Sequence, residues 1–563
     1  MKALQNVILA GVALAMMYLV QCLRQHRLRH ANWPQLPRSS IWGHLRVIGE
    51  FIANGNNKRH IDAVFSEMYE ALGKVPAFIV DLYPIGPLMC VVCCHEVAEQ
   101  ITKPSRAFPY SLPKAPTTRA FDGLFGSRSI VIAEGDDWSS LRRRFNPGFS
   151  SQNLVRLLPY IVEKTQRFIG ILNEFTTSGE AFEMNELCTN LTFDIIGSVT
   201  LGIDLHAQQG KDYQNEMIRL FREICSTYYG NTNRRNMIPS WDFLRRRWLV
   251  HKLDVMIKNH IRQIFTRKSQ TSNAGHELKI ESRSILSLCL QDIDELTPEL
   301  VDQICDQLKT FLFAGHDTTS ILLQWAIYEL SRTPHALNAT CQELDKVFGS
   351  DTRPERVHEQ LLSGRGKTLL SRLPYTSAVI KETLRLYPPS GTARYCNPGS
   401  AFTVRLPDGS VRCLDGLVLY NCESIIQRDE VIYGANRNVF VPERWLGNTD
   451  TSQQANEDHL SGRCSRAFGY QIPPSAWRPF ERGPRNCIGQ ELANIEARVI
   501  LASVIRKYQF TKVGLGEIQR DKDDNLVLGS DGQYEIQSQL YNKLEVTAKP
   551  VDGTKMRVRL AKE

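Results

Sequence analysis

The chain has 563 residues and a formal net charge of +8, and 42% of its residues are hydrophobic and 23% are charged. This balance is that of an ordinary folded protein, and it excludes disordered and collagen-like chains. The 68 basic residues exceed the 60 acidic ones only slightly for this length, so the charge gives no argument for a nucleic-acid partner and we predict none.

An apolar segment opens the chain. Residues 7–20, VILAGVALAMMYLV, are apolar or neutral without a break, and with their apolar neighbours they reach the roughly 20 residues that a helix needs to cross a bilayer. A cleaved signal peptide is the alternative, but the apolar run continues past the candidate cleavage site at residues 13–15. Arginines follow in residues 24–29, while Lys2 alone precedes the run. Because positive charge stays in the cytosol, we predict an uncleaved transmembrane anchor at residues 1–23, with the body of the chain cytosolic.

After the anchor we expect a hinge and one large domain. Residues 24–40 are basic and contain Pro34 and Pro37, which cannot extend a helix, so we predict a stiff hinge. The length alone would allow several domains, but residues 41–563 contain neither a linker nor an internal repeat. We therefore predict that they form a single domain.

Apolar residues recur at helical spacing through most of residues 41–386, with strands expected at 76–84 and 87–94. Strand signals return later, because residues 402–421 and 543–560 each read as a hairpin. The predicted fold class is mainly α with a segregated minor β-sheet, preceded by one N-terminal transmembrane helix.

The 14 cysteines are scattered, which indicates reduced thiols rather than a disulfide framework. The tightest group is Cys90, Cys93 and Cys94. No second ligand pair follows at zinc spacing, and no histidine follows Cys93 as covalent haem attachment would require. We predict a buried strand that carries these thiols as small apolar side chains.

Residues 234–268 are basic, with Trp241, Phe243 and Trp248 interleaved. A membrane-surface contact and a nucleic-acid patch are two functional interpretations. We favour a solvated helix face with a buried apolar stripe, because apolar residues recur at helical spacing.

A long helix is predicted over residues 297–332, with Thr297 as its N-cap and a proline at its first helical position. Its middle, AGHDTT at residues 314–319, places a glycine beside a charge and two β-branched hydroxyl residues within an apolar helix. Such a violation of local preference is expected at a functional site. The structural alternative is a packing glycine next to a solvated Asp-Thr step.

Residues 480–489, FERGPRNCIG, end where a long helical pattern begins. A thiol at a helix N-terminus meets the positive end of the dipole, which lowers its pKa and favours a thiolate that can ligate a metal. Gly483 permits the turn, Gly489 permits a flat cofactor to approach, and Arg485 supplies a cation for its acidic groups. The alternative for Cys487 is one more buried apolar cysteine.

The pattern F-x-x-G-x-R-x-C-x-G in these residues is the haem-binding signature of the cytochrome P-450 family, and the chain resembles that family from about residue 33 to its end. The resemblance implies the cytochrome P-450 fold and a haem b cofactor whose iron takes the Cys487 thiolate as axial ligand. It also implies that Phe480, Arg485 and Gly489 contact the haem.

The stretch at residues 314–319 resembles the oxygen-activation motif of the same family. The resemblance implies that Asp317 and Thr318 deliver protons for cleavage of the O–O bond. His316 stands at the free position of the motif, and a proton relay, substrate binding and packing all stay open for it.

Further matches concern the haem propionates. Trp138 and Arg142 resemble the W-x-x-x-R helix of the family, whose spacing puts both side chains on one face. Arg394 lies in a region that often supplies another propionate partner in the family.

Glu382 and Arg385 lie three residues apart on a predicted helix and can bond to each other, which alone would be a routine surface pair. The stretch PERW at residues 442–445 resembles the P-E-R-F element of the family, with tryptophan for phenylalanine. The resemblance implies that Arg444 joins Glu382 and Arg385 in a buried structural network that holds the cysteine loop.

The resemblance implies a haem-thiolate monooxygenase that hydroxylates or epoxidises an apolar small molecule. Electrons would come from NADPH through a separate NADPH-cytochrome P-450 reductase, with cytochrome b5 as a second donor, because the chain has no dinucleotide fingerprint of its own. The anchor predicts a single-pass protein of the endoplasmic reticulum membrane. The loops resemble those of fungal members that make secondary metabolites, polyketides or terpenoids, including oxygenases of the sterigmatocystin and aflatoxin kind.

Two other classes stay open. A haem-thiolate isomerase or dehydratase would need neither dioxygen nor a reductase, and the intact Asp317-Thr318 pair weighs against it. A non-catalytic haem sensor is disfavoured by the same pair.

Overall fold

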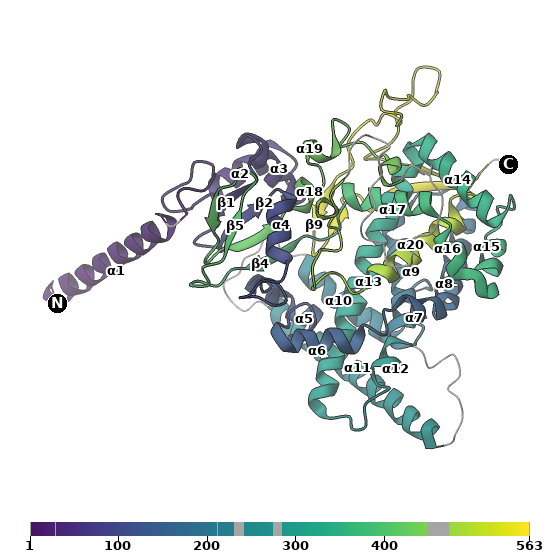
Figure 1. The fold of residues 1–563 in the computed structure, drawn as a ribbon, viewed down its shortest axis with the longest axis horizontal. Coiled ribbons are helices and arrows are strands. Elements are labelled where there is room, and N and C mark those ends of the chain that lie inside the picture. The colour runs from purple at the N-terminus through teal and green to yellow at the C-terminus, as the bar shows by residue number, and fades with distance from the viewer. Residues whose placement is uncertain are drawn as a thin grey trace.

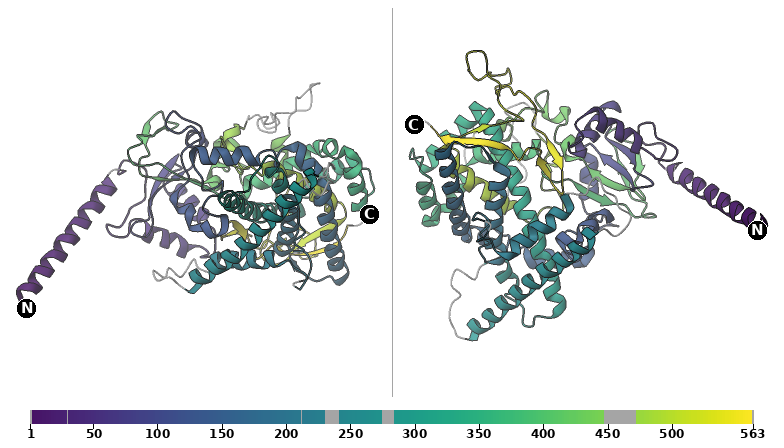
Figure 2. Two further views of the ribbon diagram at one scale, coloured as in Figure 1. Left: turned by 90° about the horizontal axis from the view of Figure 1, so that it is seen from below. Right: turned by 180° about the vertical axis from the view of Figure 1, so that it is seen from behind.

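The structure, a computed structural model, describes residues 2–28, 30–210, 212–229, 241–273, 284–446 and 472–561. A large helical lobe lies beside a smaller lobe that contains a four-stranded sheet, and α1 (Lys2–Leu28) projects from the smaller lobe (Figures 1 and 2). The prediction of a mainly α fold with minor sheets is confirmed.

The α-helices follow the chain in this order: α1 Lys2–Leu28, α2 Leu45–Asn54, α3 Ile61–Ala71, α4 His95–Thr102, α5 Asp122–Phe125, α6 Gly135–Phe145, α7 Ser151–Arg156, α8 Leu158–Ser178, α9 Met184–Ile196, α10 Glu216–Tyr229, α11 Trp241–Asn273, α12 Ile285–Cys289, α13 Pro298–Arg332, α14 Pro334–Phe348, α15 Pro354–Gln360, α16 Gly366–Ser371, α17 Pro374–Leu386, α18 Glu423–Ile426, α19 Glu430–Tyr433 and α20 Gln490–Val504. The strands are β1 Ala77–Asp81, β2 Leu88–Val92, β3 Phe182–Glu183, β4 Thr392–Tyr395, β5 Thr403–Arg405, β6 Val411–Cys413, β7 Val418–Asn421, β8 Tyr508–Lys512, β9 Asn542–Leu544, β10 Ala548–Pro550 and β11 Lys555–Leu560.

The larger sheet has the order β1-β2-β7-β4, in which β2 and β7 are parallel and the other pairs antiparallel. Cys90 of β2 lies opposite Ile79 on one side and Leu419 on the other. Cys90, Cys93 and Cys94 are buried as predicted, and burial raises the pKa of the Cys94 thiol to about 12. These thiols therefore pack as neutral, apolar side chains.

The C-terminal strands form two separate sheets. A hairpin over residues 542–550 joins β9 to β10, so it is shorter than the hairpin predicted over residues 543–560. The last strand, β11, leaves this hairpin and lies between β3 and β8. Pro550 ends β10 and has no N–H with which to continue a ladder, whereas side chains of β11 alternate between buried and exposed over residues 555–559.

The long helix α13 runs through the helical lobe. The hydroxyl of its N-cap, Thr297, accepts a hydrogen bond from the backbone N–H of Leu300, as the sequence predicts. A Cβ at Gly315 would lie 2.5 Å from the Ile196 side chain of α9. Gly315 is therefore needed for close packing of α13 on α9, which was the structural alternative for this residue.

The N-terminal helix α1 extends to Leu28, beyond the predicted anchor of residues 1–23. Its last turn is attached to the small lobe, because Arg27 Nε lies 2.8 Å from Asp81 Oδ2 in a buried ion pair. None of the helices in the described part of the chain is both long and apolar enough to cross a bilayer, so the predicted transmembrane span is not confirmed. The structure describes this helix, but it does not describe several side chains of the predicted span, such as those at positions 7, 12 and 19.

The basic segment at residues 234–268 forms most of α11, and its first residues, 234–240, lie outside the described part. The predicted buried stripe is present at a spacing of four residues, in Leu249, Leu253, Ile257 and Ile261. Trp241, Phe243 and Trp248 are exposed.

Candidate active site

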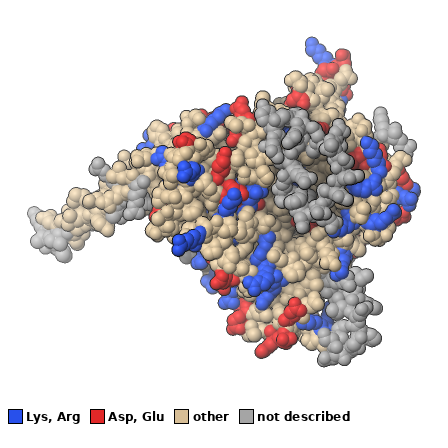
Figure 3. All heavy atoms as spheres, viewed as in Figure 1, with Lys and Arg blue, Asp and Glu red and all other residues tan. Residues whose placement is uncertain are grey.

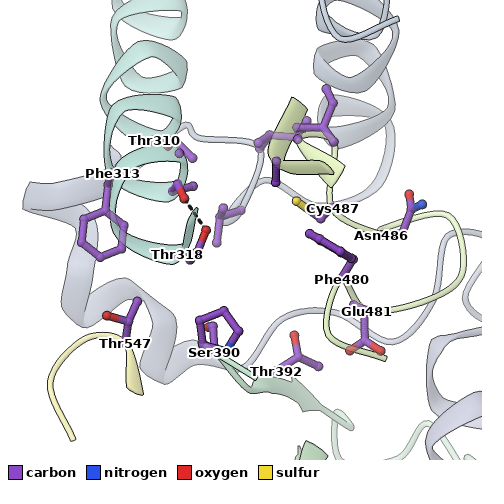
Figure 4. A pocket seen from close by; sticks show the side chains of 18 of the residues that line it. Thr310, Phe313, Thr318, Ser390, Thr392, Phe480, Glu481, Asn486, Cys487 and Thr547 are labelled. Atoms are coloured by element: carbon purple, nitrogen blue, oxygen red, sulfur yellow. Dashed lines mark hydrogen bonds between the residues drawn. The ribbon is translucent and has the colours of Figure 1, made fainter. Parts of the chain in front are cut away.

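A cavity of about 510 Å³ lies between α13 and the loop of residues 480–489. Thr310, Phe313 and Thr318 of α13 form one wall, and Cys487 lies on the opposite side (Figure 4). The helix and the loop are far apart in the sequence, so the tertiary fold creates the cavity.

Backbone geometry fixes the cysteine loop. The Cys487 N–H donates to the carbonyl oxygen of Phe480 at 2.8 Å, and Phe480 itself lines the cavity. Gly483 has a φ of +78°, and a Cβ there would lie 2.2 Å from the carbonyl oxygen of Thr102 at the end of α4. Only glycine fits this turn. At Gly489 a Cβ would come no closer than 3.8 Å, so space beside the Cys487 sulfur stays open.

The Cys487 side chain is open to the cavity. Burial in the protein raises the pKa of its thiol, whereas backbone N–H groups of Gly489 and Gln490 and the charge of Arg142 lower it. The backbone N–H groups at the start of α20 lower the pKa of this thiol, as predicted, but burial outweighs them. A bound metal cation would supply the charge that this buried sulfur needs in order to ionise.

Trp138 and Arg142, both on α6, line the cavity. Arg142 donates to the carbonyl and side-chain oxygens of Asn486 at 2.7 and 2.9 Å, and so holds the residue before Cys487. Arg485 lies over the Trp138 ring, 5.3 Å from its centroid, and forms an ion pair with Glu134. These side chains lie together, as the sequence predicts.

Two further cations stand close by. Lys114, which sequence reasoning missed, lines the cavity and donates to Thr392 Oγ1 at 2.9 Å. Arg394 is fully buried and forms an isolated β-bridge with Lys114, but it is not one of the described residues that line the cavity. Burial and the charges of Arg394 and Arg485 hold the pKa of Lys114 well below its usual range.

These residues fit haem. Among the described residues, Arg394 Nε and Nη2 are buried without a hydrogen-bond partner, beside a cavity edged by other cations. Buried donors without partners are costly, and two carboxylates of a flat cofactor would relieve both the missing bonds and the mutual repulsion. No group of three candidate metal ligands occurs in the described part of the chain, but haem iron needs one protein ligand, and the Cys487 sulfur at the cavity could supply it.

Asp317 and Thr318 sit differently with respect to the cavity. Thr318 lines it, and its hydroxyl donates to the Ala314 carbonyl oxygen at 2.7 Å (dashed line in Figure 4). Asp317 is fully buried and is not one of the described residues that line the cavity, so the alternative of a solvated Asp-Thr step is wrong. Its carboxylate lies 2.6 Å from Lys549 Nζ and accepts a hydrogen bond from the Thr547 hydroxyl.

His316 is not among the described residues that line the cavity, and its Nε2 lies 3.8 Å from Asp317 Oδ1. Its ring stacks on Phe193 with 3.7 Å between centroids, and its Nδ1 lies 2.7 Å from the Leu312 carbonyl oxygen. Burial lowers its pKa to about 4, so the ring is neutral at pH 7. Of the three roles left open, the packing one matches this geometry.

Glu382, Arg385 and Arg444 meet in a buried network. Arg385 donates twice to Glu382 at 2.8 Å, and Arg444 Nε lies 3.1 Å from Glu382 Oε1. Arg385 also donates to the carbonyl oxygen of Gln427, whose side chain accepts from the backbone N–H of Arg478, just before the cysteine loop. The network therefore reaches the cysteine loop through Gln427.

A second residue that the sequence analysis did not identify is Glu496 of α20, which lines the cavity. Burial raises the pKa of its carboxyl well above the usual range. The signal was present, because Glu496 is the one carboxylate in the mainly apolar stretch ANIEARVILA.

Comparison with known proteins matches residues 39–536 to the family described as "Cytochrome P450". The chain is 32% identical over 496 residues to "Cytochrome P450 monooxygenase acrF" of Aspergillus aculeatus, covering 85% of this chain and 93% of that protein. It is 29% identical to "Cytochrome P450 monooxygenase polC" of Polytolypa hystricis, covering 91% and 87% of the two chains. Its fold matches the crystal structure of the cytochrome P450DA heme domain with a TM-score of 0.69, at 18% identity and over 94% of this chain and 97% of that one.

Proposed function

Because the chain belongs to the cytochrome P-450 family, we propose that it is a haem-thiolate monooxygenase that transfers one oxygen atom of O2 to an apolar small molecule, by hydroxylation or epoxidation. The observation that carries the proposal is the Cys487 side chain, which opens into the cavity across from Thr318. Haem b, when bound, supplies the iron chemistry that activates dioxygen. The residues proposed to hold its propionates are Trp138, Lys114, Arg142, Arg394 and Arg485.

The residues of this chain then have separate tasks. Cys487 would ligate the haem iron, and Phe480 and Gly489 would leave room for the ring beside it. Thr318 presents its hydroxyl on the cavity wall and is proposed to pass protons to the reacting oxygen, with Asp317 behind it as the acid that supplies them.

The lining of the cavity supports an apolar substrate that carries some oxygen atoms. Phe121, Phe125 and Phe313 form an aromatic cluster, in which the centroids of Phe125 and Phe313 are 5.3 Å apart. Hydroxyl groups are interspersed with these rings, in Thr117, Thr118, Thr310 and Ser390. Such a surface buries an apolar skeleton and orients it by a few hydrogen bonds. A polyketide or terpenoid of secondary metabolism is the proposed class.

Electron donors and location are part of the same proposal. Electrons would come from NADPH through a separate reductase, with cytochrome b5 as a second donor. We propose membrane attachment through α1, with the catalytic domain on the cytosolic face of the endoplasmic reticulum. The side chains of Ile8, Leu9, Leu14 and Met16 on α1 are exposed, and the coloured part of this projecting helix is almost free of charged residues (Figure 3). Apolar surface of this kind favours lipid contact.

A haem-thiolate isomerase or dehydratase is the second candidate, and a haem sensor the third. Neither class needs the Asp317-Thr318 pair. A substrate-dependent consumption of NADPH and O2 separates the first candidate from both.

The test is to express the chain with haem, reduce it and record the spectrum with carbon monoxide for wild type and Cys487→Ala. A strongly red-shifted Soret band that is lost in the variant is the expected result. Turnover with reductase, NADPH and ¹⁸O2 should then place one labelled oxygen atom in the product. A folded, haem-loaded wild type without the shifted band would contradict the assignment of Cys487.

A further inference from the structure

The hairpin of β9 and β10 carries polar side chains at alternate positions: Lys543, Glu545, Thr547 and Lys549. In this hairpin Lys549 lies directly opposite Lys543. The two lysines are joined through Glu545, whose carboxylate oxygens lie 2.8 Å from Lys543 Nζ and 3.6 Å from Lys549 Nζ.

This row of charges continues into α13. Lys549 Nζ lies 2.6 Å from Asp317 Oδ1, and the hydroxyl of Thr547 donates to Asp317 Oδ2. Exposure falls steadily along the row, from 36% for the Lys543 side chain and 15% for Glu545 to 10% for Lys549 and 0% for Asp317. The row therefore leads from the protein surface to a carboxylate without solvent access.

Asp317 cannot reach the cavity directly, because it is not among the described residues that line it. Thr547 does line the cavity, and Figure 4 shows its side chain below α13, beside Phe313. Thr547 thus hydrogen-bonds to the buried carboxylate and is also one of the residues that line the cavity. Thr318, the other hydroxyl of this wall, is hydrogen-bonded to the Ala314 carbonyl oxygen, and no bond from it to Asp317 is found among the described residues.

From this arrangement we propose that Thr547 connects Asp317 to the cavity for proton delivery and that Lys549 is the positioning residue that holds Asp317. This inference rests on the proposed monooxygenase function, whose reaction consumes protons in the cavity. Neither residue belongs to the oxygen-activation motif, and both come from a hairpin more than 200 residues further along the chain.

The step balances as a relay of one proton. The Lys549 ammonium group gives a proton to the Asp317 carboxylate, with which it forms an ion pair. Asp317 passes a proton to the Thr547 oxygen while the Thr547 hydroxyl gives its own proton to an acceptor in the cavity, and Lys549 is reprotonated from the side of Glu545. One proton moves from the surface to the cavity, no electron moves, and each group returns to its starting state.

The test uses the haem-loaded full chain with Thr547→Val, Thr547→Ser and Lys549→Met. We expect Thr547→Val to keep its haem content, carbon monoxide spectrum and KM, while kcat for product falls by a factor on the order of 10² and NADPH is diverted to hydrogen peroxide. Thr547→Ser should restore kcat, and the solvent deuterium isotope effect on kcat should rise in Thr547→Val.

An infrared measurement on the resting protein is independent of turnover. Lys549→Met removes the ammonium group 2.6 Å from the Asp317 carboxylate and leaves His316, with its Nε2 3.8 Å from Asp317 Oδ1, as the remaining ionisable partner. A buried carboxylate that loses its cation favours the protonated acid. We therefore expect a new carbonyl band of a carboxylic acid in Lys549→Met, and its loss when Asp317→Asn is added.

The chain offers matched controls on the neighbouring sheet. Lys512 Nζ lies 2.6 Å from Asp552 Oδ2 with a fully buried side chain, so Lys512→Met removes an equivalent ion pair. Thr554 donates to Gln324 of α13 at 3.1 Å, and Thr554→Val removes an equivalent hydroxyl. Both controls should lower stability and leave the coupling of NADPH to product unchanged.

The outcomes are distinct. A wild type without the thiolate-type carbon monoxide spectrum or without oxygen incorporation would overturn the proposed function and the relay with it. A functional wild type whose Thr547→Val variant keeps its kcat and isotope effect would overturn the relay alone. A Lys549→Met variant without the new carboxylic-acid band at pH 7 would overturn the positioning role of Lys549.

Discussion

Glu382→Gln should destabilise the protein far more than an ordinary loss of an ion pair. The Glu382 carboxylate accepts from Arg385, Arg444, the Trp445 indole and the Val441 N–H at 2.8 to 3.1 Å. Its side chain has no solvent exposure, and those of Arg385 and Arg444 are 0% and 4% exposed. Glutamine keeps the shape but leaves two buried guanidinium groups without an anion, which costs about 3–5 kcal/mol.

This cost can be converted into a shift of the melting temperature. With an unfolding entropy of about 2.1 cal/mol/K per residue, the melting temperature of a chain of this length that unfolds as one unit falls by about 3–4 °C. Circular dichroism melting at matched haem content measures the shift. The control is the same change in the exposed pair of Arg356 and Glu359. These residues are also three positions apart, and Arg356 Nη1 lies 3.1 Å from Glu359 Oε2. Glu359→Gln should cost about 0.2–1 kcal/mol.

If the melting temperatures of Glu382→Gln and Glu359→Gln differ by less than about 1 °C, the buried network does not stabilise the fold as argued. Haem content gives a second readout, because the network reaches the cysteine loop through Gln427. We expect the variant to lose haem faster than wild type on mild heating.

Three more predictions concern the site and its surroundings. Lys114→Met should release haem faster to a haem-scavenging apoglobin, because the cavity loses a cation; a release rate equal to that of Lys512→Met would contradict this role. Gly315→Ala should destabilise by about 1–3 kcal/mol through its clash with Ile196, and adding Ile196→Ala should recover part of the loss in denaturant unfolding; additive losses would refute the packing argument. His316 has a pKa near 4 in the folded protein and an ordinary value of 6.5, so the unfolded chain binds its proton first and stability falls as pH drops from about 6.5 toward 4. His316→Leu should weaken this acid dependence, and an unchanged slope of stability against pH would show that the ring is already protonated in the fold.

The long helix at residues 297–332, the mainly α fold and the proposed haem-binding role of Cys487 could be predicted from the sequence, because each depends on residues close together in the chain. Apolar periodicity and caps determine helices locally. The ten-residue signature determines the kind of site without knowledge of what surrounds it.

Only the tertiary structure decided what surrounds these motifs. Lys549 and Thr547 reach Asp317 across 232 and 230 positions, and no local pattern encodes which distant side chain meets a given carboxylate. The same holds for Lys114 beside Arg394. The raised pKa of Cys487 was also decided by the fold, because burial depends on every element that packs around the thiol, whereas the helix N-terminus read from the sequence is one contribution among several.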